Sequence, residues 1–189
     1  MENFLAQIKD RAKKNPARLV FVEGSEARVL EAIQIIEYEG LALPLTFEDP
    51  VKDPHFEDFV QKFMALRGAS EAEARSKMQN PHYFATMMVQ EGLADGMIAG
   101  PMATSRERIL PALEIIKTKE KFHKVSGFLF MILPADVDSD AANGGVLLFA
   151  DCAVNVEPDV KTLADIAIDS AETAKRFGVE PVIAMLSFS

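Results

Sequence analysis

Short, continuous apolar segments alternate with stretches of helical periodicity along the whole chain. The apolar segments, rich in branched or aromatic side chains, are residues 18–22 (RLVFV), 41–47, 95–99, 125–133, 146–150 and 182–186. Between them, apolar residues recur every three or four positions, as they do on one face of a helix. Continuous apolar strands that alternate with amphipathic helices are typical of a mostly parallel sheet with helices on both faces. We therefore expect a three-layer α/β/α fold with a mostly parallel sheet.

Polar residues and glycines mark where the predicted helices begin and end. A side chain that accepts a hydrogen bond from a free backbone amide favours a helix start, and a glycine favours the end. Ser70 and Glu73 have the spacing of a capping box, and Asn80 followed by Pro81 is another helix start. The remaining predicted starts and stops are Ser25 with Gly40, Gly92, Ser105, and Asp159 with Gly178.

The hydrophilic segment 136–145 interrupts this pattern. It holds three aspartates and then the turn sequence Asn143-Gly144-Gly145. The segment is the best candidate for a boundary between domains, and a simple hairpin loop explains it about as well. Ligands of such sheets bind beyond the carboxyl ends of the strands. Sites are therefore expected at residues 23–25, 100–105, 151–155 and 187–189.

Composition and motifs exclude several classes of protein. The 189 residues include 29 acidic and 20 basic side chains, a formal charge of −9, so nucleic acid is not expected as a partner. A single cysteine, Cys152, excludes an intrachain disulfide framework and fits a reducing compartment. The three histidines are scattered, so no metal is expected. No segment reads as a leader or a membrane span, and the sequence contains no glycine-rich nucleotide-binding motif. We expect a cytoplasmic protein with no membrane partner.

Two features could bind an anionic ligand. Cys152 follows a predicted strand, which places it at the expected ligand edge, although a free cysteine is more often a small buried apolar residue. The densest basic stretch could receive an anion locally, but it could equally be the solvated face and end of one helix. Its residues are Arg106, Arg108, Lys117, Lys119, Lys121 and Lys124.

The sequence resembles the phosphate acetyltransferase and phosphate butyryltransferase family. The resemblance covers nearly the whole chain, and the run FADCAVN with the following helix SAETA is more similar to the acetyltransferase branch. The matching segments, in family order, are RLVFVEGSEARVLEA (18–32), NPHYFATMMVQEGLADGMIAG (80–100), PALEIIKT (111–118), VLLFADCAVNVEPD (146–159), LADIAIDSAETAKRFG (163–178) and EPVIAMLSFS (180–189).

This resemblance implies two α/β/α domains similar to those of the isocitrate and isopropylmalate dehydrogenases. It implies reversible acetyl transfer between coenzyme A and phosphate, commonly in a homodimer and without a metal. The implied ligands are coenzyme A or acetyl-coenzyme A and phosphate or acetyl phosphate. The expected domains are 1–134 and an incomplete second domain, 135–189. The substrate-binding candidates are Lys124, Cys152, Arg106, Arg108, Ser187 and Ser189, and no catalytic residue is assigned.

The chain also departs from the family pattern. Family members continue beyond Ser189 with the segments that carry the proposed base and a transition-state arginine, so we expect these 189 residues alone to be inactive. Gln79 and Leu110 stand where arginine is common, and Ala103 stands where histidine is common. Arg106, Arg108 or Lys124 could replace the lost charge. The competing interpretation is a non-catalytic module that senses acyl-coenzyme A or binds a partner, as is thought of the related part of large malic enzymes.

Overall fold

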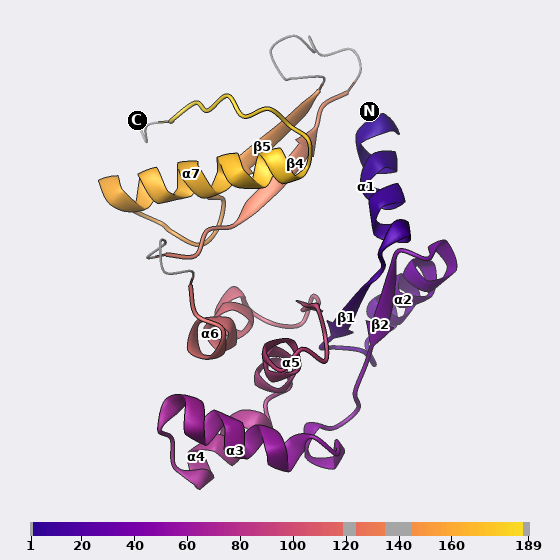
Figure 1. Cartoon of the computed structure of the whole chain (residues 1–189), viewed down its shortest axis with the longest axis vertical. Coiled ribbons are helices and arrows are strands. Elements are labelled where there is room, and N and C mark those ends of the chain that lie inside the picture. Colours follow the sequence, from indigo (N-terminus) through magenta and orange to yellow (C-terminus); the bar gives the residue numbers. More distant parts are fainter. Residues whose placement is uncertain (1, 119–123, 135–144, 187–189) are drawn as a thin grey trace. The chain divides into compact units, whose positions relative to one another are not determined.

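The structure is a computed structural model that describes residues 2–118, 124–134 and 145–186 (Figure 1). It divides into two compact units. One comprises Lys9–Lys117 and is called here the 9–117 unit. The other combines Met1–Ile8 with Thr118–Ser189 and is called the 118–189 unit. The domain boundary predicted after Pro134 remains a prediction.

A three-stranded parallel sheet lies at the centre of the 9–117 unit. Its strands are β1 (Ala17–Phe21), β2 (Ala42–Leu45) and β3 (Gly96–Ile98), in the order β2-β1-β3. Val20 pairs with Leu45 on one side and with Met97 on the other. Strands β2 and β3 fall within segments predicted from the sequence, and β1 is shifted by one residue toward the N-terminus from the predicted 18–22. Their parallel pairing confirms the predicted arrangement for this unit.

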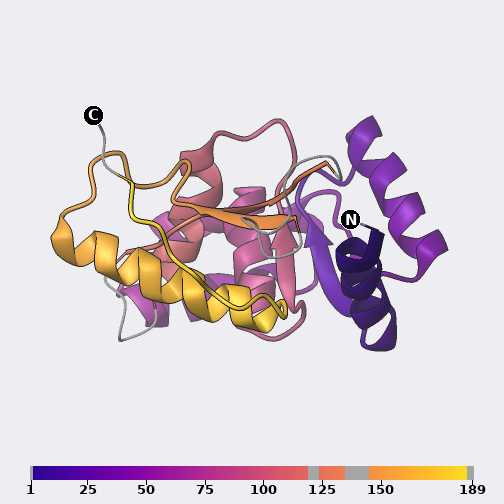
Figure 2. The same ribbon diagram turned by 90° about the horizontal axis from the view of Figure 1, so that it is seen from above.

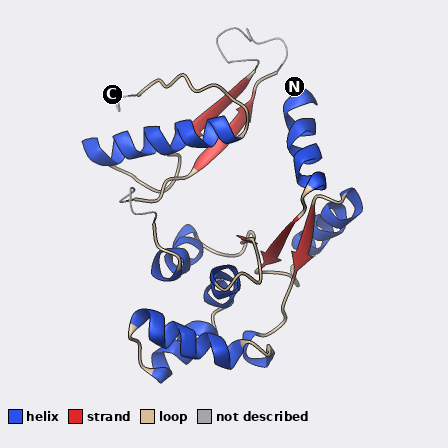
Figure 3. Ribbon diagram, viewed as in Figure 1, coloured by secondary structure: helices blue, strands red, loops and turns tan. Residues whose placement is uncertain are grey.

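Helices cover both faces of this sheet. Successive side chains of a strand point to opposite faces, and Val20 and Val22 pack with Ala85 of α5 (Pro81–Gln90). Phe21 points the other way and packs with residues of α2 (Ala27–Glu39), including Val29. The mixed α/β class with helices on either side of a parallel sheet is therefore confirmed (Figure 3).

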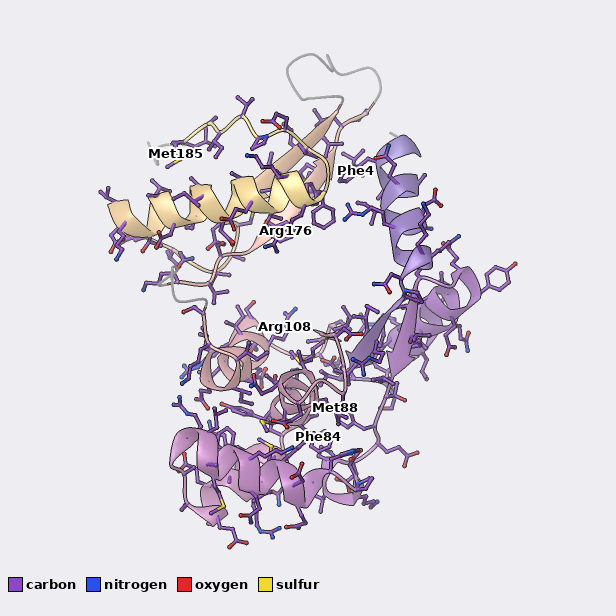
Figure 4. All side chains as sticks on the ribbon, viewed as in Figure 1. Phe4, Phe84, Met88, Arg108, Arg176 and Met185 are labelled. Atoms are coloured by element: carbon purple, nitrogen blue, oxygen red, sulfur yellow. The ribbon has the colours of Figure 1, made fainter. Side chains whose placement is uncertain are left out.

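The largest apolar core lies among the helices of the 9–117 unit. These helices are α3 (Phe56–Arg67), α4 (Glu71–Met78), α5 and α6 (Ser105–Ile115), preceded by the short 3-10 helix η1 (Pro50–Lys52). Phe84 of α5, labelled in Figure 4, is fully buried, and its ring lies 5.2 Å from that of Phe47 and 5.1 Å from that of Phe59. Edge-on and tilted contacts of this kind add to the stabilisation from buried area.

The predicted helix starts are confirmed with two corrections. At α4 the Ser70 side chain accepts a hydrogen bond from the amide of Glu73, but the return bond of the predicted capping box is not formed. The side chain of Asn80 accepts hydrogen bonds from the amides of His82 and Tyr83 at the start of α5. Ser25 was predicted to cap α2, but the cap is Glu26, whose carboxylate accepts hydrogen bonds from the amides of Arg28 and Val29. A carboxylate one residue later satisfies the same free amides and also suits the positive end of the helix.

The 118–189 unit holds an antiparallel hairpin and one long helix. Strands β4 (Phe128–Ile132) and β5 (Val146–Ala150) pair in antiparallel register, so the residues that flank 135–144 form the hairpin that was one of the two interpretations. Helix α7 (Val160–Arg176) lies along the hairpin (Figures 1 and 2). The ring of Phe130 lies 4.8 Å from that of Phe177 and 5.2 Å from that of Phe4 in α1 (Glu2–Lys14).

The predicted final strand over 182–186 does not form. These residues have no regular secondary structure, and Val182 and Leu186 are 95% and 87% exposed. A strand needs a neighbouring strand that satisfies its backbone groups. The segment is apolar, as the sequence shows, but among the described residues no strand pairs with it.

Candidate functional site

Two loops meet at the carboxyl edge of the parallel sheet, where the sequence predicted a ligand site. Glu23 follows β1, and its Oε2 accepts a hydrogen bond from the amide of Gly100, which follows β3. A Cβ atom on Gly100 would lie only 2.8 Å from the same oxygen, so glycine lets the two loops approach each other. Oε1 of Glu23 lies 3.9 Å from Nε2 of buried His82, and neither atom has a hydrogen-bond partner among the described residues.

The loop after β3 leads into helix α6, which begins with a complete capping box. The hydroxyl of Thr104 accepts a hydrogen bond from the amide of Glu107, and a carboxylate oxygen of Glu107 accepts one from the amide of Thr104. The side-chain hydrogen bond from Thr104, followed by the backbone one, lowers the pKa of Glu107. The box fixes the first turn of α6, which carries the predicted site residues Arg106 and Arg108.

Helices α4, α5 and α6 enclose a pocket of about 340 Å³ in the 9–117 unit. Arg106 lines this pocket together with Leu110, the residue that stands where the family pattern has arginine. Arg108, labelled in Figure 4, does not line it, and its Nε donates to the backbone carbonyl of Thr104 at 3.3 Å. Gln79 is exposed at the end of α4. Of these positions, the pocket brings Arg106 and Leu110 together.

A polar network of three side chains joins the helices beside this pocket. Nζ of Lys77 donates to the hydroxyl of Tyr83 at 2.7 Å and to Glu114 at 3.0 Å, and the Tyr83 hydroxyl donates to Glu114 at 2.8 Å. Burial opposes the charge on Lys77 and on Glu114, but these hydrogen bonds outweigh it, so the pKa of Lys77 is raised and that of Glu114 is lowered. Burial raises the pKa of Tyr83.

In the 118–189 unit, the carboxylate of Asp151 organises the loop that carries Cys152. Oδ1 accepts hydrogen bonds from the amides of Ala153 and Val154, both at 3.1 Å, and Oδ2 accepts one from the amide of Asn155 at 2.9 Å. Burial alone would raise the pKa of Asp151, but hydrogen bonds from Ala153, Asn155 and Val154 lower it. The Cys152 side chain is exposed and is a free thiol, so it is not the buried apolar residue of the alternative interpretation.

The same loop is tied to the segment that leads into β4. The side-chain amide of Asn155 donates to the carbonyl of Val125 at 2.9 Å, next to Lys124. The charge of Lys124 is among the causes that lower the pKa of Asp159, after the hydrogen bonds from Thr162. Lys124 and Cys152 therefore lie on adjoining loops, whereas Ser187 and Ser189 lie outside the described residues.

Several residues of these two regions were not predicted. Lys77 and Glu114 are 37 positions apart, so no local pattern could pair them. The role of Asp151 had a signal in the sequence. An aspartate just after a predicted strand is typical of a turn, in which its side chain accepts hydrogen bonds from the backbone amides that follow. Over the residues that the structure describes, no three potential ligands are grouped to hold a metal ion, and no helix is long and apolar enough to cross a membrane.

Relatives of known name match this chain over most of its length. A phosphate acetyltransferase of Bacillus subtilis (strain 168) is 35% identical over 100% of the chain and 63% of the relative, and one of Clostridium acetobutylicum is 38% identical over 99% and 63%. A crystal structure of a phosphotransacetylase from Streptococcus pyogenes superposes with a TM-score of 0.87 and 30% identity, covering 100% of this chain and 63% of that one. The EutD phosphotransacetylase from Staphylococcus aureus gives a TM-score of 0.83 with 32% identity, over 99% of this chain and 61% of that one.

The chain thus spans about 63% of the length of these curated relatives. The model of the family described as "Phosphate acetyl/butaryl transferase" matches residues 45–189, which include β3, the pocket, the Asp151 loop and α7. With the parallel sheet and the matching solved structures, this establishes that the chain belongs to the phosphate acetyl/butyryl transferase family.

Proposed function

We propose that this chain takes part in the reversible transfer of an acetyl group between coenzyme A and phosphate. The observation that carries the proposal is the match to relatives named phosphate acetyltransferase over 99–100% of the chain. Coenzyme A, acetyl-coenzyme A, phosphate and acetyl phosphate are the proposed ligands, with coenzyme A as a substrate and no metal in the transfer step. A homodimer in the cytoplasm belongs to the same proposal.

The chemistry of the reaction sets what the chain has to supply. The thiol of coenzyme A must lose a proton and attack the carbonyl carbon of acetyl phosphate, and phosphate leaves as the carbon–oxygen bond breaks. Positive groups stabilise the oxyanion that develops and the phosphate that departs. Arg106 at the pocket, and Lys124 beside the Asp151 loop, are the cations of this chain that we assign to anion binding. Cys152, Arg108, Ser187 and Ser189 remain substrate-binding proposals.

A second candidate function is a non-catalytic module that binds acyl-coenzyme A. The observation that favours it is Leu110, an apolar residue that lines the pocket at a position where the family pattern has arginine. Gln79 and Ala103 likewise stand where arginine and histidine are common, so they too replace a basic side chain with an uncharged one. Such a module would bind the cofactor without lowering the barrier for acetyl transfer.

A hybrid enzyme separates the two candidates. In it, residues 1–189 replace the matching part of the Bacillus subtilis relative, and formation of acetyl-coenzyme A from acetyl phosphate is followed against the unmodified relative. The first candidate predicts acetyl transfer by the hybrid. A folded hybrid without transfer, together with coenzyme A binding by the 189 residues alone, supports the second candidate.

The 189 residues are also assayed alone. We predict that they form no acetyl-coenzyme A, and turnover at an enzymatic rate would overturn this part of the proposal.

A further inference from the structure

The pocket between α4, α5 and α6 combines an apolar wall with a cationic one. Half-buried Leu110 and buried Pro111 line it from α6, and buried Tyr83 lines it from α5. The cations Lys77 and Arg106 line it from α4 and α6. At about 340 Å³, the pocket lies at the small end of the range for ligand sites, roughly 300–1,000 Å³. Its composition suits a small molecule with one anionic end and one short apolar end.

The two cations of the pocket differ in what they already contact. The ammonium of Lys77 donates to the Tyr83 hydroxyl and to the carboxylate of Glu114, so its charge is largely compensated. Arg106 is exposed, and among the described residues its guanidinium has no hydrogen bond or ion pair. Arg106 therefore keeps its donors for a ligand.

The neighbouring charged residues on α6 are held away from this role. Glu107 also lines the pocket, but its Oε2 accepts hydrogen bonds from the amide and the hydroxyl of Thr104, both at 2.7 Å. The carboxylate thus completes the helix cap. Arg108 donates to the carbonyl of Thr104 and does not line the pocket. The cation that faces the pocket without a competing partner is Arg106.

We propose that Arg106 binds a phosphoryl group at this pocket, with the short apolar part of the ligand against Leu110 and Pro111. The guanidinium offers paired donors that match the geometry of phosphoryl oxygens. The ligand is a small acyl phosphate or the phosphate end of a longer cofactor, which share this chemistry. The choice of acetyl phosphate as the probe rests on the proposed function. The pocket and its free guanidinium are observations of the structure and are independent of that function.

Arg106→Gln and Lys14→Gln form a control pair, because each removes one positive charge from an exposed side chain of the 9–117 unit, and Lys14 does not line the pocket. The purified 189-residue chain is titrated with inorganic phosphate, acetyl phosphate and coenzyme A while its backbone amide resonances are followed. We expect acetyl phosphate to shift amides of residues 76–83 and 105–111. Arg106→Gln should weaken this binding about tenfold, or roughly 1.4 kcal/mol, which is the size of one charge-assisted hydrogen bond. Lys14→Gln should weaken it by less than about twofold.

Arg106→Lys provides a second variant that keeps the charge and loses the paired donors, and we expect binding between those of the wild type and Arg106→Gln. Absence of shifts at the pocket with either phosphate probe would overturn the assignment, as would equal weakening by Arg106→Gln and Lys14→Gln. Shifts of the same amides by coenzyme A that depend on Arg106 support the phosphoryl site and identify the cofactor as its source. Coenzyme A binding elsewhere, without phosphate binding at the pocket, overturns this site and leaves the proposed function standing. Phosphate binding at the pocket without any coenzyme A binding supports this site and overturns the proposed function.

Discussion

Removing the carboxylate of Asp151 is expected to destabilise the loop of the 118–189 unit that carries Cys152. The carboxylate accepts hydrogen bonds from four backbone amides, those of Ala153, Val154 and Asn155 at 2.9–3.1 Å and that of Gly127 at 3.4 Å. The amide of exposed Ala153 can turn to water, whereas Val154 and Asn155 are half-buried. Leaving the half-buried amides of Val154 and Asn155 unsatisfied costs about 1–3 kcal/mol each, and the longer bond from Gly127 adds less, so Asp151→Ala should lower the free energy of unfolding by about 2–6 kcal/mol. Asp151→Asn keeps one acceptor oxygen and should lose about half as much.

The free energy of unfolding is measured by urea denaturation, and hydrogen exchange at the amides of residues 153–155 locates the change. Glu157→Gln is the matched control, since it removes one negative charge from an exposed residue nearby and should change stability by less than about 0.5 kcal/mol. The pKa of Asp151 is lowered in the folded protein, so its stabilisation is present above the ordinary aspartate pKa and is lost as the pH falls through the lowered value. The difference between wild type and Asp151→Asn should therefore shrink in acid. A stability of Asp151→Ala equal to that of Glu157→Gln, with unchanged exchange at 153–155, would refute this account of the loop.

Two further predictions concern the 9–117 unit. Phe84→Ala removes a fully buried ring that contacts Phe47 and Phe59, and should lower the free energy of unfolding by about 3–5 kcal/mol in urea denaturation; a loss below about 1 kcal/mol would show that this core is not packed as described. The guanidinium of Arg18 lowers the pKa of exposed Asp95 from 3.8 to about 2, so the pair stabilises the fold above pH 3.8 and this stabilisation is lost as the pH falls toward 2. Asp95→Asn should remove that part of the acid dependence of stability, and an unchanged acid profile would contradict the assignment.

The core of the sheet was predictable because its signal is local. The run of residues 18–22 is apolar and branched, and its alternate side chains do pack against α5 and α2 on opposite faces. The antiparallel hairpin was one of two interpretations of residues 136–145, because a turn sequence shows a change of direction but not which strands will pair. The strand expected over 182–186 fails for a related reason, since apolar character alone does not supply a partner with free backbone groups.

The candidate site was predictable only in part, because it depends on contacts between distant residues. The sequence indicated Arg106, Arg108 and Lys124 equally as sources of positive charge. The structure separates the first two through tertiary contacts, since the pocket includes Arg106 but not Arg108. Likewise, the sequence alone does not distinguish Lys77 from the other basic residues. Its contact with Glu114 in the structure shows that its charge is already compensated.

The central claim is that this chain takes part in acetyl transfer between coenzyme A and phosphate. Its most direct test is the binding of coenzyme A to the 189-residue chain, measured by isothermal titration calorimetry. Membership of the phosphate acetyl/butyryl transferase family, with the proposed function, predicts saturable binding with one coenzyme A per chain and competition by acetyl-coenzyme A. Folding is verified on the same sample by circular dichroism and by the dispersion of its amide resonances. A folded chain that releases no heat with coenzyme A, and whose amide resonances do not shift when it is added, would contradict the claim.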